Sequence, residues 1–157
     1  IKVLVPKGLG KPLGMYSHGV VASGGELVVV AGQVGLDGAG KPAGADVIAQ
    51  TKQALENVEA VLAAAGCTMK DVIRFQTFLT GAEYIEGFMQ TRREVFPAYF
   101  PGGAYPPNTL LVVSRLVRPE LLVEIEAMAV KPGRGGAAPK PRAKPRGRKT
   151  RATRRRR

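Results

Sequence analysis

Residues 46–80 read DVIAQTKQALENVEAVLAAAGCTMKDVIRFQTFLT, in which a helical pattern is followed at once by a strand pattern. Apolar residues recur at helical spacing through its first half. Asp46 is a good N-cap residue, and Gly66 suits the position just after a helix end. β-branched and aromatic side chains then dominate, which is typical of a strand. The stretch therefore predicts a helix over 46–65 followed by a strand over 71–80.

Strands are also predicted on the N-terminal side of that helix. LVVVAGQ at 27–33 is an apolar run of strand length, and 16–23 is a second candidate strand. Gly24 and Gly25 supply turn chemistry between the two, so we expect a hairpin. A glycine-rich loop over 35–45 then leads to the helix.

The C-terminal side predicts one more helix and two more strands. The helix spans 83–100, and Pro97 should bend or end it near its last turn. Strands follow over 109–116 and 121–130. This order indicates an α+β domain with a single mixed sheet and both helices on one face. Because the other face would stay uncovered, we expect a homo-oligomer.

Charge is concentrated at one end of the 157-residue chain. Residues 131–157 hold 13 of the 24 Lys and Arg and none of the 12 Asp and Glu, so the preceding 130 residues are nearly neutral. That distribution excludes a small basic fold whose own surface binds nucleic acid. The uncharged residues of the tail are only Pro, Gly, Ala and Thr, so we expect it to be disordered.

The chain thus divides into an N-terminal extension (1–15), one domain (16–130) and a basic tail (131–157). Three interpretations of the tail remain open. It binds nucleic acid weakly and in a salt-dependent way, it is a solubilising extension, or it contacts an anionic membrane surface. No apolar run is long enough to span a bilayer and no signal peptide is visible, so we expect a cytoplasmic protein.

Cysteine and histidine counts limit the chemistry. Cys67 is the only cysteine and His18 the only histidine. They exclude a disulfide scaffold, a cysteine-rich zinc site and a multi-histidine metal site, and they argue against a Ser-His-Asp triad. Cys67 follows a helix and is expected to be a small packed side chain.

Several residues are candidates for a site. Alternation along the last strand puts Glu124 and Glu126 on one face, where they form either a solvated surface or, beside a cleft, a general base. Gly32 interrupts an apolar strand, which marks either a bulge or the close approach of a backbone or a ligand. Asn108 follows two prolines and is either a turn residue or an amide that binds a carboxylate or carbonyl.

Five segments in combination resemble the reactive-intermediate deaminase family, RidA or YjgF. They are YSHGV (16–20), VVVAGQVGLD (28–37), QTKQALENVEAVLAAAG (50–66), DVIRFQTFL (71–79) and VEIEAMAV (123–130). The resemblance implies a chorismate-mutase-like fold and a homotrimer with a central barrel, with small-molecule sites between subunits. It also implies hydrolysis of imine or enamine intermediates to oxo products and ammonia, without metal or cofactor. Some family members have been described as endoribonucleases or translation inhibitors.

The resemblance also implies roles for individual residues. Tyr16 matches the family's site tyrosine. Ala31 and Gly32 match the small-residue pair whose backbone contacts the ligand. Glu124, the first glutamate of VEIEA, matches the glutamate that holds the attacking water.

Position 108 departs from the family pattern. Deaminating members have an arginine there that grips the substrate carboxylate, and this chain has Asn108. An amide cannot form the charged bidentate clamp. Arg115 lies at an odd offset on the expected strand and is a poor replacement, whereas Arg93 on the second helix is expected to supply the charge from a neighbouring subunit.

Three functions follow from these observations. One is an imine or enamine hydrolase with altered substrate preference. A second is a trimer that binds a small metabolite without turning it over, which Asn108 favours. The third is a nucleic-acid-associated trimer that displays its basic tails, whose weak contacts would add to avidity.

Overall fold

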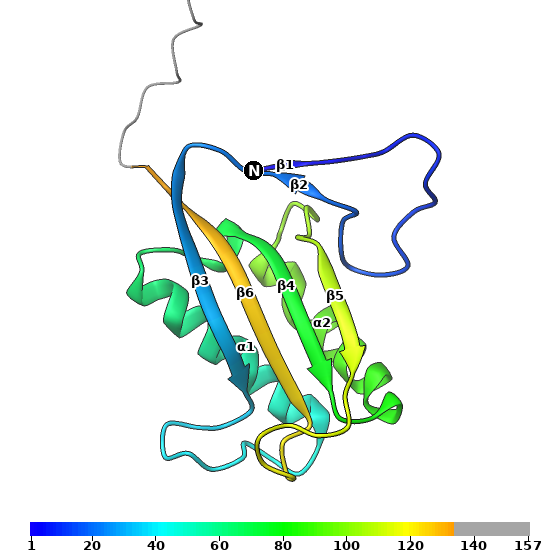
Figure 1. Ribbon diagram of the computed structural model, residues 1–157, viewed down its shortest axis with the longest axis vertical. Coiled ribbons are helices and arrows are strands. Elements are labelled where there is room, and N and C mark those ends of the chain that lie inside the picture. Colours follow the sequence, from blue (N-terminus) through cyan, green and yellow to red (C-terminus); the bar gives the residue numbers. More distant parts are fainter. Residues whose placement is uncertain (134–157) are drawn as a thin grey trace, which may run out of the picture.

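The computed structural model describes residues 1–133, in which both helices cover one face of a four-stranded sheet (Figure 1). The sheet order is β3-β6-β4-β5, and a separate pair joins β1 to β2. The elements are β1 (Lys2–Val3), β2 (Val20–Val21), β3 (Gly25–Val34), α1 (Val47–Ala64), β4 (Val72–Leu79), α2 (Ile85–Tyr99), β5 (Asn108–Val112) and β6 (Val123–Pro132), with 3-10 turns at Met69–Asp71 and Ala82–Tyr84.

The predicted α+β class with one mixed sheet is confirmed. Strand β6 runs antiparallel to both β3 and β4, and β5 runs parallel to β4. The last strand continues to Pro132, two residues past the expected boundary of the domain. The expectations about the basic tail otherwise concern residues outside the described part of the chain.

The expected hairpin between 16–23 and 27–33 is wrong. Only Val20 and Val21 form a strand, and their partners are Val3 and Lys2 of the chain's own N-terminus. Gly24, with φ of 76°, turns the chain between β2 and β3. The local pattern indicated extended segments correctly, but strand partners depend on long-range packing, which turn chemistry alone does not fix.

Both ends of α1 are capped by the residues that the sequence predicts. The Oδ1 atom of Asp46 accepts a hydrogen bond of 2.9 Å from the Ala49 amide. At the other end Gly66 has φ of 75°, and the Cys67 amide donates to the Leu62 carbonyl at 2.9 Å. These caps satisfy backbone groups that a helix terminus leaves without partners.

An aromatic cluster joins α2 to the sheet. The ring of Phe96 lies 6.0 Å from that of Phe75 on β4 and 5.2 Å from that of Phe100. Pro97 lies inside α2, which ends two residues later at Tyr99, as expected from a proline near the last turn. The cluster fixes the helix against β4 close to the start of β5.

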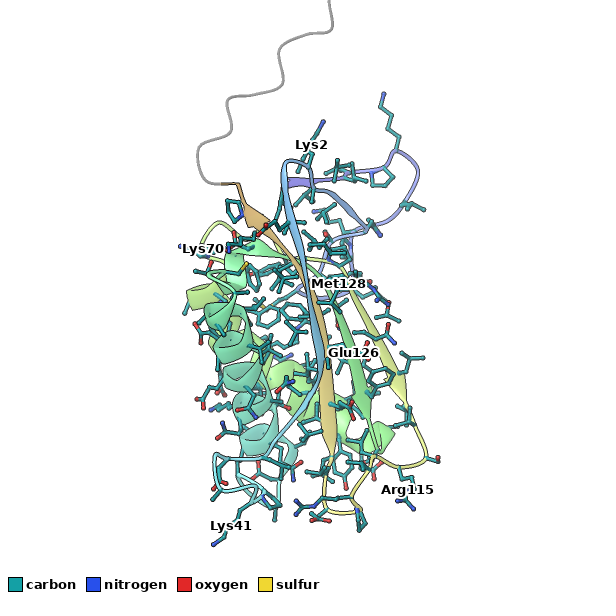
Figure 2. All side chains as sticks on the ribbon, turned by 60° about the vertical axis from the view of Figure 1, so that its left-hand side comes forward. Lys2, Lys41, Lys70, Arg115, Glu126 and Met128 are labelled. Carbon is teal, nitrogen blue, oxygen red and sulfur yellow. The ribbon has the colours of Figure 1, made fainter. Side chains whose placement is uncertain are left out.

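Strict alternation gives the sheet two different faces. Along β6 the buried side chains are Val123, Ile125, Ala127 and Ala129, which pack under the helices. Glu126 and Met128 point to the opposite side (Figure 2). This open face also exposes apolar side chains of β3, with Leu27 58% and Val29 65% exposed.

Candidate functional site

Glu124 and Gly32 meet on the open face of the sheet. The register of β3 and β6 shifts between Val30 and Gln33, so Ala31 and Gly32 form a bulge opposite Glu126. A Cβ atom on residue 32 would lie 1.8 Å from Oε1 of Glu124. A side chain on residue 32 would displace the carboxylate from this position. The bulge, one of the two alternatives expected for Gly32, is confirmed, and what approaches the glycine closely is the Glu124 side chain.

The surroundings of Glu124 raise the pKa of its carboxyl above that of an exposed glutamate. Burial, followed by the charge of Glu126, raises the pKa of the Glu124 carboxyl. Within residues 1–133 no side chain or backbone group donates a hydrogen bond to this carboxylate. A carboxylate with a raised pKa and unoccupied oxygen atoms is suited to hold a water molecule and accept its proton.

A hollow of about 220 Å³ lies on the open face and is lined by Glu126, two residues beyond Glu124 on β6, rather than by Glu124 itself. Its walls combine apolar atoms of Val29 and Met128 with the charged groups of Arg74 and Glu126. Ala31 also lines it, directly next to Gly32. Gly32 and Glu124 lie side by side, with Ala31 next to Gly32 along β3, and their role as a site stays a prediction.

Two side-chain amides on α1, one buried and one half-buried, hold the chain segments on either side of this cluster, and sequence reasoning did not identify either role. Asn57 Nδ2 donates to the carbonyls of Val34 at 3.0 Å and Leu36 at 2.9 Å, which fixes the end of β3 beyond the bulge. Gln50 is fully buried, donates to the Glu120 carbonyl at 2.9 Å and accepts from the Leu122 amide at 2.9 Å. The sequence signal that could have identified them is a polar residue on the face of the predicted helix that carries the apolar pattern.

Asn108 belongs to a second cluster, at the start of β5. It pairs with buried Phe75 across the parallel ladder, so its side chain leaves the sheet on the helix-covered face. The Oδ1 atom of Asn108 accepts a hydrogen bond of 3.0 Å from Thr77 Oγ1. Asn108 thus lies on the opposite face from Glu124, and β4 separates their strands.

Tyr16 lies in the N-terminal segment near the same end of β5. It lines a hollow of about 230 Å³ together with His18 and Tyr105. Its hydroxyl accepts a hydrogen bond of 3.3 Å from the Leu13 amide, and His18 Nε2 donates to the Gly10 carbonyl at 2.7 Å. Tyr16 therefore neighbours the Asn108 cluster rather than Glu124.

The two adjacent arginines of α2 have opposite environments. Arg93 is exposed and forms an ion pair of 2.5 Å with Glu86. Arg92 is 2% exposed, donates to the Met15 carbonyl and stacks on Phe96 with its guanidinium carbon 4.3 Å from the ring centre. Sequence reasoning selected Arg93, whereas the structure buries Arg92 beside Asn108.

The remaining candidates lie away from both clusters. Cys67 is buried, and burial raises the pKa of its thiol, consistent with a packed side chain. Arg115 lies beyond the end of β5, at the end of the sheet away from Asn108 (Figure 2). Among residues 1–133 there is no grouping of side chains suited to a metal ion and no helix able to cross a membrane.

Comparisons with known proteins cover most of the chain and show its family. The family model described as Endoribonuclease L-PSP matches residues 9–131. A RutC family protein of Pyrococcus horikoshii is 36% identical over 131 residues, covering 83% of this chain and 98% of its own length. Protein DfrA of Myxococcus xanthus is 38% identical over 121 residues, covering 76% and 88%.

Solved structures show the same fold. The Rid family protein YyfB of Yersinia pestis superposes with a TM-score of 0.73 at 31% identity, covering 83% of this chain and 98% of its own. TdcF of E. coli, solved with bound serine, has a TM-score of 0.62 at 28% identity, covering 83% and 99%. The fold and these matches define the class of small Rid-type α+β proteins. The chain belongs to the RidA/YjgF family.

Proposed function

We propose that this protein hydrolyses imine or enamine intermediates to oxo compounds and ammonia. The observation that carries the proposal is the seating of the Glu124 carboxylate against the backbone of Gly32. Membership of the RidA/YjgF family supports it. No metal or cofactor is part of the proposal.

Glu124 would act as the base for water addition. It accepts a proton from a bound water as the water oxygen bonds to the imine carbon and the C=N π pair moves to nitrogen, and it then passes that proton to the nitrogen. The resulting carbinolamine loses its nitrogen as ammonia when the C–N bond breaks. Glu124 takes the proton of the carbinolamine hydroxyl as the C=O bond forms and gives it to the leaving nitrogen.

A complete site would require more than one copy of the chain. Glu124 and Asn108 leave opposite faces of the same sheet, so one small molecule does not contact both within a single copy. The exposed apolar side chains of the open face, among them Leu27, Val29 and Leu111, support burial against another copy. We propose a homotrimer with sites between subunits. Val29→Lys is expected to dissociate it in sedimentation equilibrium.

The test is a coupled assay in which an amino-acid oxidase generates 2-imino acids in situ and semicarbazide traps what is not hydrolysed. The native protein is expected to suppress trapping, and Glu124→Gln is expected to lose the effect. Glu120→Gln makes the same chemical change at an exposed ion pair with Arg118 and serves as control. Equal activity of Glu124→Gln and native protein would refute the role of Glu124.

A second candidate function is binding without turnover. The amide of Asn108 replaces the positive charge expected there, which favours this alternative. The relative TdcF was solved with serine bound, so ligand retention by such a fold has a precedent. An inert native protein that gains activity through Asn108→Arg would establish the alternative.

A further inference from the structure

Arg92 is a buried cation without an anionic partner. Only 2% of the residue is exposed, and no carboxylate of residues 1–133 lies within 4 Å of its nitrogen atoms. One terminal nitrogen donates to the Met15 carbonyl, while Nε has no hydrogen-bond partner. Buried charges in proteins are normally paired, so this arrangement calls for an explanation.

The aromatic neighbours of Arg92 compensate only in part. Its guanidinium carbon lies 4.3 Å from the ring centre of Phe96 and 5.6 Å from that of Phe88. Cation–π contacts stabilise the charge through the ring faces but do not satisfy an N–H group in the guanidinium plane. Burial lowers the pKa of Arg92 to about 10, which keeps it protonated at neutral pH.

Arg92 and Asn108 line the same small cavity, between α2 and the start of β5. Its volume is about 10 Å³, close to the minimum for one water-sized group. Thr77 donates to Oδ1 of Asn108, which leaves the Nδ2 hydrogens of the amide without a partner in the described chain. The two polar groups that remain without a partner, Arg92 Nε and Asn108 Nδ2, are therefore both hydrogen-bond donors. The Arg92 guanidinium adds a positive charge beside them.

We propose that Arg92 and Asn108 together bind the carboxylate group of a small ligand. One carboxylate oxygen enters the cavity at Nε of Arg92, and the amide of Asn108, half-exposed on the edge strand, contacts the carboxylate at its mouth. Arg92 thus supplies from α2, within the same copy of the chain, the charge that position 108 lacks. This inference rests on the proposed function, because the ligand is taken to be a substrate or product of that reaction. Its test measures binding and does not require hydrolysis.

Binding to the native full-length protein is followed by NMR through the Arg92 Nε–H signal. The probes are pyruvate and 2,3-butanedione, in which an uncharged methyl ketone replaces the carboxylate. Pyruvate is expected to shift the signal saturably and bind at least 10-fold more tightly than butanedione. Equal affinities for the two probes, or a signal that pyruvate leaves unchanged, would overturn the proposal.

Three variants complete the test. Arg92→Lys keeps the charge but loses Nε, and is expected to weaken pyruvate binding at least 10-fold. Arg118→Lys makes the same change at a surface pair with Glu120 and should leave affinity within 2-fold. Arg93→Ala tests whether Arg93, rather than Arg92, binds the carboxylate. If this variant alone lost pyruvate binding, Arg93 would be the cation that holds the carboxylate and the proposal would be wrong.

Asn108→Asp separates loss of binding from loss of folding. The new carboxylate would pair with Arg92, so pyruvate affinity should fall while the melting temperature rises. A fall in both would contradict the proposal. If pyruvate binding depends on Arg92 but imine hydrolysis is absent, the proposed hydrolase activity fails and the carboxylate site stands. If the protein hydrolyses imines but pyruvate binding does not depend on Arg92, the carboxylate site is refuted and the proposed hydrolase activity stands.

Discussion

The Oε1 atom of Glu124 occupies the space that a side chain on residue 32 would need, 1.8 Å from the position of its Cβ. The two residues come from antiparallel strands and meet because a bulge in β3 brings Gly32 close to the start of β6. The position of the carboxylate therefore depends on the absence of a side chain across the ladder.

Gly32→Ala is expected to displace the Glu124 carboxylate and reduce imine hydrolysis by about 100-fold, because a misplacement of about 1 Å costs that much in an oriented site. The free energy of unfolding should fall by less than about 1 kcal/mol, because the displaced oxygen is the far end of a flexible, half-buried side chain. Gly38→Ala, where a Cβ meets no atom within 4 Å, is the matched control for both measurements. Unchanged activity in Gly32→Ala would disprove the coupling.

The pH dependence of kcat/KM should report Glu124. Its raised pKa means that it takes up a proton at a higher pH than an ordinary glutamate, so activity falls as pH decreases through that raised value. Glu126→Gln removes a charge that raises the pKa, and should move the acidic limb to lower pH. An acidic limb that stays in place would show that Glu126 does not act on the catalytic group.

Gln50→Leu is expected to lower the free energy of unfolding by about 2–4 kcal/mol, because it leaves buried backbone groups of the 120–122 turn without partners. Chemical denaturation measures the change. Gln90→Leu, at an exposed position of α2, should change stability by less than about 0.5 kcal/mol. Similar losses in the two variants would show that the buried amide has no special role.

Asn57→Asp should be destabilising in a pH-dependent way. At neutral pH the carboxylate would face the carbonyl oxygens of Val34 and Leu36 with no hydrogen to donate, at a cost of about 1–3 kcal/mol. That environment raises the pKa of the new group in the folded state. Stability relative to the native protein should therefore recover as pH falls and be lost as it rises. Urea denaturation at several pH values tests this, and a pH-independent difference would contradict it.

Sequence pattern was sufficient to predict several helices and strands and the two faces of the last strand. Helix α1, its caps at Asp46 and Gly66, strand β4 and the alternation of β6 all follow from periodicity and local backbone preference. These signals act over a few residues, so they survive without knowledge of the fold. The same alternation placed Glu124 on the face opposite the core.

Tertiary structure alone decided which residues meet. The partner of β2, the seat of Glu124 on Gly32 and the side of the sheet that carries Asn108 depend on register between strands distant in the sequence. Arg92 and Arg93 are sequence neighbours, but a helix turns by about 100° per residue, so one is buried and the other exposed. Local pattern does not assign that rotation, because it is set by the aromatic core against which α2 packs.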